Sequence, residues 1–97
     1  MFERYPIHEL IESRRKSLGI GRGELATRCG FKNVFKGMRR IDSVCNGDLD
    51  SAGAKMVLAN LPAALEVDKD TVETAIRATA EMVLEAQRRA EAEREAA

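Results

Sequence analysis

The sequence predicts an all-α fold with five helices packed around one core. Alanine, leucine, glutamate and arginine recur along the chain, and runs of β-branched residues are missing, which favours helices. Apolar residues recur at steps of three and four, as on the buried face of an amphipathic helix. With 97 residues, the chain is long enough to bury one modest core.

The first helix is expected from Pro6 to about Leu18, because proline suits a first helical turn. Gly19 ends it. Basic residues gather near its C-terminal end, where the helix dipole favours cations. Arg14 and Arg15 of this group either contact a phosphate backbone or only complement the dipole. The apolar stripe of the helix consists of Ile7, Leu10, Ile11 and Leu18.

A short second helix from about Arg22 to Cys29 and a third from about Asn33 to Asn46 follow, separated by Gly30. Glycine at this point suits the left-handed conformation that a helix end often needs. The third helix is the most clearly divided segment of the sequence. Its apolar stripe is Val34, Met38, Ile41 and Cys45, and its opposite face carries Lys36, Arg39, Arg40 and Ser43.

The fourth helix carries Val57, Leu58, Leu61 and Leu65, and Pro62 predicts a kink or a break within it. The last helix begins near Asp68 to Thr71. Its apolar stripe includes Val72, Ile76 and Val83, with Met82 at the edge, whereas the tail after Gln87 has no apolar face. We therefore divide the chain into residues 1–67, with the first four helices, and residues 68–97, an extended helix for packing or oligomerisation.

Charge also divides the chain, at a point near Gly47. Residues 1–47 hold ten lysines and arginines against five acids, a net charge of +5, and residues 48–97 hold six against eleven, a net charge of −5. A basic half suits a polyanion. The two cysteines, Cys29 and Cys45, are expected to be small buried hydrophobes. No signal or membrane-spanning segment is evident, so a cytoplasmic location is expected.

Four features resemble the DNA-binding domain of the phage repressor and Cro family, the lambda-repressor-like or XRE helix-turn-helix proteins. They are the basic helix ending in Leu18-Gly19-Ile20, the segment from Glu24 to Phe31 with Ala26 four residues before Gly30, the end of the third helix at Ile41–Gly47, and Ala63–Asp68 leading into a final helix. The resemblance covers Pro6–Val72 and implies a lambda-repressor-like five-helix bundle that binds DNA through its third helix.

The chain departs from that family in two places. Gly21-Arg22 stands where the family usually has Ser-Gln, and the stretch from Gly30 to Gly47 is several residues longer. A direct transfer of the family's register would put Lys36 in the core. The residues facing DNA are therefore assigned from the periodicity of this sequence alone.

These observations predict a sequence-specific DNA-binding regulator, a repressor, that binds double-stranded DNA. A homodimer is expected through the stripe of Val72, Ile76 and Val83 on the last helix; alternatively, this stripe covers the first and fourth helices within one chain. Asn33 either caps the third helix or contacts an adenine, and Gly37 is expected to allow a close approach of a phosphate or of a partner's backbone. Glu9 and Glu12 are expected to be solvated. No catalytic pair, phosphate-binding loop or metal cluster is seen, so no enzyme activity, cofactor, metal or small-molecule ligand is expected. The alternative is a helical protein-binding module without DNA binding. The expected DNA contacts are Arg22, Lys32, Asn33, Lys36, Arg39, Arg40 and Ser43.

Overall fold

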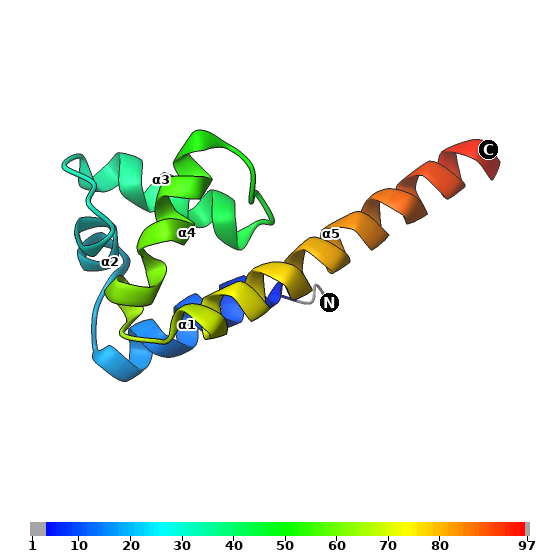
Figure 1. Ribbon diagram of the computed structural model, residues 1–97. Helices are drawn as coiled ribbons and strands as arrows, with labels where there is room; N and C mark the ends of the chain where they lie inside the picture. The colour runs from blue at the N-terminus through cyan, green and yellow to red at the C-terminus, as the bar shows by residue number, and fades with distance from the viewer. Residues whose placement is uncertain (1–3, 97) are drawn as a thin grey trace.

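The computed structural model describes residues 4–96, and within this range the chain is all-helical, with five helices and no strand. The helices are α1 (Pro6–Leu18), α2 (Arg22–Arg28), α3 (Val34–Cys45), α4 (Ala52–Leu65) and α5 (Lys69–Ala96). Helices α1 to α4 form a compact body, and α5 runs beside α1 and then continues away from that body (Figure 1).

Helix α1 begins and ends where the sequence predicts. Pro6 occupies the first helical position, and Gly19 ends the helix with a φ of 68°, in the left-handed region. There its backbone N–H donates to the carbonyl of Lys16, and that of Ile20 donates to the carbonyl of Arg15. These two bonds satisfy carbonyls that a helix end leaves free.

A short turn joins α2 and α3. One glycine at this turn and another inside α3 allow the two helices to lie close together. Gly30 has a φ of 92°, as its place after α2 predicts. Gly37, inside α3, is buried, and a Cβ atom there would lie 2.7 Å from the Cβ of Ala26 and 2.8 Å from the Cβ of Phe31. Gly37 therefore allows α3 to approach α2 closely. The expectation that this glycine admits a phosphate or a partner's backbone is wrong, because the chain itself fills the space.

The same contact corrects the predicted buried stripe of α3. Val34 is 36% exposed and Met38 is only partly buried, whereas the face that meets the core comprises Gly37, Ile41, Val44 and Cys45. Turning Gly37 toward Ala26 moves Val34 to the edge of α3. There its Cγ1 lies 3.3 Å from where a Cβ on Gly23 would be.

Helix α4 is a single helix that continues through Pro62, so the predicted break is not present. Pro62 lies in the last turn, where the loss of one backbone N–H interrupts little of the helix. The side chain of Ser51 caps the start of α4 by accepting from the N–H of Ala54 at 3.1 Å. Glu66, with a φ of 55°, ends the helix in the left-handed conformation.

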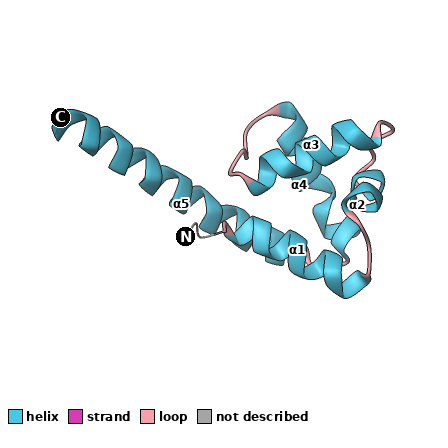
Figure 2. Ribbon diagram, turned by 180° about the vertical axis from the view of Figure 1, so that it is seen from behind, coloured by secondary structure: helices cyan, strands magenta, loops and turns pink. Residues whose placement is uncertain are grey.

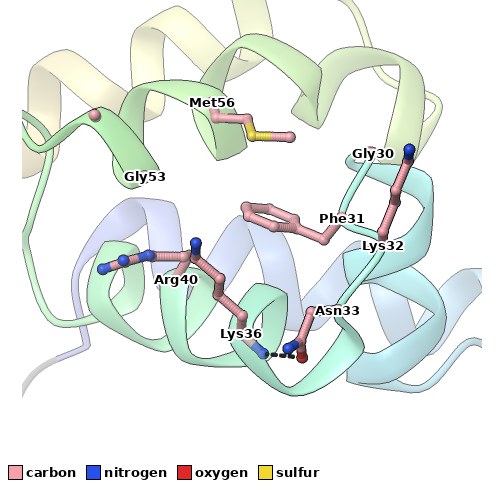
Figure 3. A pocket seen from close by; sticks show the side chains of 9 residues that line it. Gly30, Phe31, Lys32, Asn33, Lys36, Arg40, Gly53 and Met56 are labelled. Carbon is pink, nitrogen blue, oxygen red and sulfur yellow. Dashed lines mark hydrogen bonds between the residues drawn. The ribbon is translucent and has the colours of Figure 1, made fainter.

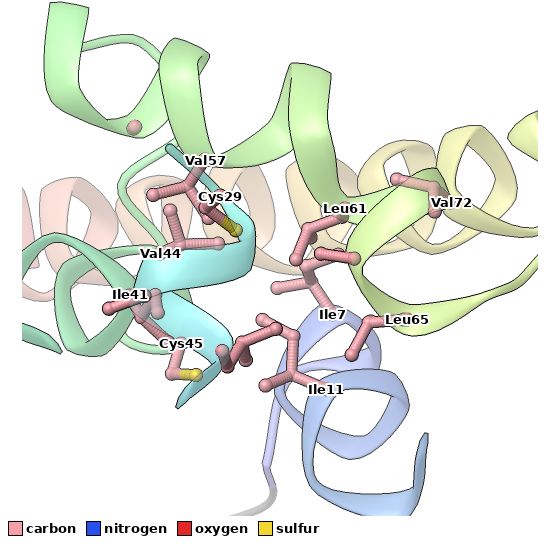
Figure 4. Close-up of a cluster of buried hydrophobic side chains, with 14 of the residues drawn as sticks. Ile7, Ile11, Cys29, Ile41, Val44, Cys45, Val57, Leu61, Leu65 and Val72 are labelled. Carbon is pink, nitrogen blue, oxygen red and sulfur yellow. The ribbon is translucent and has the colours of Figure 1, made fainter. Parts of the chain in front are cut away.

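All five helices contribute to one core, which Figure 4 shows in close-up. The first half of α5 belongs to it, because Val72 is 2% exposed and Thr79 is fully buried. The N–H of Ile7 donates to the hydroxyl of Thr79 at 3.0 Å, which fixes α5 against the start of α1. Val72 is therefore not available for a subunit contact, contrary to expectation. Figure 2 shows the second half of α5 extending beyond α1.

The two cysteines lie in this core, as predicted. Both are free thiols at 0% and 4% exposure, and burial raises the pKa of Cys29 and of Cys45 to about 11. The thiols therefore stay protonated and pack as small apolar side chains. Within residues 4–96, no helix combines the length and the apolar character that crossing a membrane requires.

Candidate nucleic-acid interface

The solvent face of α3 and the turn before it carry four cationic side chains. Lys32, Lys36, Arg39 and Arg40 are all exposed. Within residues 4–96, none of the four takes part in an ion pair. Periodicity predicted Lys36, Arg39 and Arg40, with Ser43, on one side of the third helix, and Lys32 was expected separately, just before that helix. In the structure Lys32, Lys36 and Arg40 line one groove, and Arg39 is exposed on the same helix. We call Lys32, Lys36, Arg39 and Arg40 the basic face of α3.

The basic face continues into a shallow groove between α3 and α4. Lys32, Lys36 and Arg40 line the groove together with Phe31 and Met56, as Figure 3 shows. The side chain of Arg40 lies against α4, where a Cβ on Gly53 would come within 2.5 Å of its Cδ. Gly53 therefore gives Arg40 room to extend along the start of α4.

Asn33 caps α3. Its Oδ1 accepts from the backbone N–H of Lys36 at 3.1 Å, which satisfies one of the amides that a helix start leaves free (Figure 3). Of the two roles the sequence left open, the structure thus shows the capping role. The Nδ2 group of Asn33 carries the two donors that the cap does not use.

Two more residues of α3 differ from expectation. Ser43 is only half-buried rather than fully exposed, and its carbonyl accepts from the N–H groups of Asn46 and Asp48. Phe35, which the sequence analysis did not select, is 78% exposed. The spacing could have identified Phe35, because it lies four residues before Arg39 and therefore on the same side of the helix.

Arg22, predicted as a phosphate contact, is bound within the chain instead. Its guanidinium donates to carboxylate oxygens of Glu12 on α1 and Asp42 on α3. To bind a phosphate, Arg22 would have to give up two ion pairs. It links α1 and α3 through the start of α2, and we leave it out of the candidate interface.

Glu12 is the centre of this cluster, contrary to the expectation that it is solvated. It is 7% exposed, and Arg15 donates to its Oε2 through two nitrogens at 2.6 and 2.9 Å. Burial alone would raise the pKa of Glu12, but the hydrogen bonds from Arg22 and Arg15, with their charges, lower it to about 2. The carboxylate is therefore held in its charged form.

The other two candidate phosphate contacts also have partners inside the chain. Arg15, besides binding Glu12, donates to the carbonyl of Ile20 at 3.0 Å. Arg14 donates from Nε to the carbonyl of Leu65 at 3.2 Å, which ties α1 to the end of α4. Much of the positive charge of the first half thus supports the fold, whereas the cations of α3 form no ion pair with any other residue of the described range 4–96.

Comparison of the chain with protein-family models, with curated proteins and with solved structures gave no match in any of the three.

Proposed function

We propose that this protein is a sequence-specific regulator that binds double-stranded DNA, with α2 and α3 as a lambda-repressor-like helix-turn-helix. The observation that carries the proposal is the contrast between two groups of cations. Arg14, Arg15 and Arg22 bind carboxylates or carbonyls inside the chain. The four cations of the basic face, in contrast, lie exposed on one helix and the turn before it.

Helix α3 suits the major groove in size and in presentation. Its 12 residues give a rod about 18 Å long, and the major groove of B-DNA admits one α-helix. Gly37 holds α3 against α2, so α2 supports it from behind. The start of α3, with Lys32 before it and Lys36 in its first turn, is the end that meets base edges in helix-turn-helix proteins.

The cations divide by position into two roles. Lys36, in the first turn of α3, and Arg39, one turn later, suit base edges, and guanine is the preferred partner of an arginine fork. Lys32 precedes α3, and Arg40 lies toward α4 at the edge of the groove. These two positions suit phosphates on either side of the groove, which orient a protein without reading sequence.

We also propose that two copies pair through α5 beyond Thr79. Residues 84–96 are all exposed, and Leu84 is 47% exposed although it is a large apolar side chain. A helical segment without tertiary packing is marginally stable in water, so a partner helix would stabilise it. A dimer would place two α3 helices on a two-fold operator.

Selection of bound duplexes from a random double-stranded library tests the proposal. The expected result is enrichment of a defined site. Arg39→Ala should then weaken binding to that site by about 1–3 kcal/mol, with helical circular dichroism unchanged. Arg77→Ala is the matched control, because Arg77 is an exposed arginine on α5, away from α3. Failure to enrich any duplex contradicts the proposal and favours the protein-binding alternative.

A further inference from the structure

Phe35 is a large apolar side chain that the fold does not use. It is 78% exposed, the most exposed of the large hydrophobic residues in the described chain. It is the second residue of α3, beside Val34, which is 36% exposed. Neither the core nor the cap at Asn33 requires a phenyl ring at this position.

The surroundings of Phe35 are basic rather than apolar. Lys36 follows it directly, and Arg39 lies one helical turn further along the same side. Lysine is depleted at protein–protein interfaces, so a lysine directly beside the exposed ring argues against an apolar protein partner. An exposed ring between cations instead fits a polyanion that also offers an apolar group.

The major groove of DNA offers one such group. The C5-methyl of thymine projects into it, and aromatic and methyl side chains contact that methyl. Residues at the start of a recognition helix are those that reach base edges. Phe35 therefore occupies the part of α3 from which a side chain meets a thymine methyl, while the neighbouring cations meet phosphate and guanine.

We propose that Phe35 determines specificity by packing its ring against the C5-methyl of a thymine in each half-site. This inference rests on the proposed function, because it assigns one base of the DNA that α3 would read. It also predicts that 5-methylcytosine, which carries a methyl at the same place, substitutes for that thymine better than cytosine does.

The test replaces each thymine of the selected duplex by uracil, which removes only the methyl. For the unmodified protein, one position in each half-site should lose about fourfold in affinity, the value of one buried methyl. In Phe35→Ala the same replacement should change affinity by less than about 1.5-fold, whereas Phe35→Leu should keep part of the effect.

Two controls accompany these variants. Arg77→Ala changes an exposed side chain on α5, before the segment proposed to pair two copies, and should leave both the affinity and the thymine-to-uracil ratio unchanged. Arg39→Ala should weaken binding to both duplexes equally. Because Phe35 is exposed, its variants should melt like the unmodified protein, which shows that they fold.

The outcomes separate the two proposals. If no duplex is selected, the proposed function fails. If a duplex is selected but no thymine is sensitive to loss of its methyl, or if the sensitivity persists in Phe35→Ala, the inference on Phe35 is overturned while DNA binding stands.

Discussion

Gly37 gives a prediction in which two physical effects oppose each other. Alanine in place of glycine inside a helix ordinarily stabilises it by about 1 kcal/mol. Here the added Cβ would lie 2.7 Å from the Cβ of Ala26 and 2.8 Å from both Cβ and Cγ of Phe31. These atoms lie next to the backbone, so they cannot move aside without shifting α2 or the turn.

Overpacking of this kind costs about 1–3 kcal/mol, and three contacts under 3.0 Å put Gly37→Ala in the upper part of that range. When the gain in helix propensity is subtracted, the free energy of unfolding should fall by about 1–2 kcal/mol. For a domain of this size that lowers the melting temperature by roughly 5–15 °C.

Thermal unfolding followed by circular dichroism measures the effect. Adding Ala26→Gly removes one of the clashing atoms and should recover part of the loss beyond the effect of Ala26→Gly alone. A melting temperature for Gly37→Ala equal to or above that of the unmodified protein would refute the close α2–α3 contact. It would mean that Gly37 faces open space rather than α2.

Three further predictions concern the ion pairs of Glu12, the packing of α5 and the pairing of two copies. The pKa of Glu12 is lowered to about 2 in the folded chain, so its contribution, on the order of 2–3 kcal/mol, is complete above about pH 5 and is lost as the pH falls toward 2. The Glu12→Gln variant should therefore have a lower free energy of unfolding than the unmodified protein at pH 7. Between pH 5 and pH 3, urea unfolding should show that its free energy of unfolding depends less on pH. An equal pH dependence of the two proteins would contradict this. Ending the chain after Thr71 removes buried residues of α5 and should abolish cooperative unfolding, whereas ending it after Gln87 should leave the fold intact. Sedimentation of the full chain should show a dimer, and a monomer at tens of micromolar would rule out pairing through α5.

Local rules predicted much of the fold. Pro6 and Gly19 bound α1, and Gly30 ends α2, because each has a backbone preference that holds wherever it stands. The recurrence of apolar residues at steps of three and four predicted the helices and most of the core residues. The basic face of α3 followed from the same periodicity.

The rest depends on how the helices meet, which no local pattern contains. Gly37 faces Ala26 only because α2 and α3 cross there, and that contact turns Val34 to the edge. Arg22 reaches Glu12 and Asp42, which lie 10 and 20 residues away and on two other helices. In the sequence, such an arginine looks the same as one free to bind phosphate.

The most direct test of the central claim is the salt dependence of binding to the selected duplex. Each phosphate contact should contribute about −0.9 to the slope of log affinity against log salt. Because two copies bind, Lys32→Ala removes two such contacts and should reduce that slope by about 1.8, whereas Lys55→Ala, which removes an exposed lysine from α4, should leave it unchanged. Equal slopes for the unmodified protein and Lys32→Ala, or an affinity that does not respond to salt, would contradict DNA binding through the basic face.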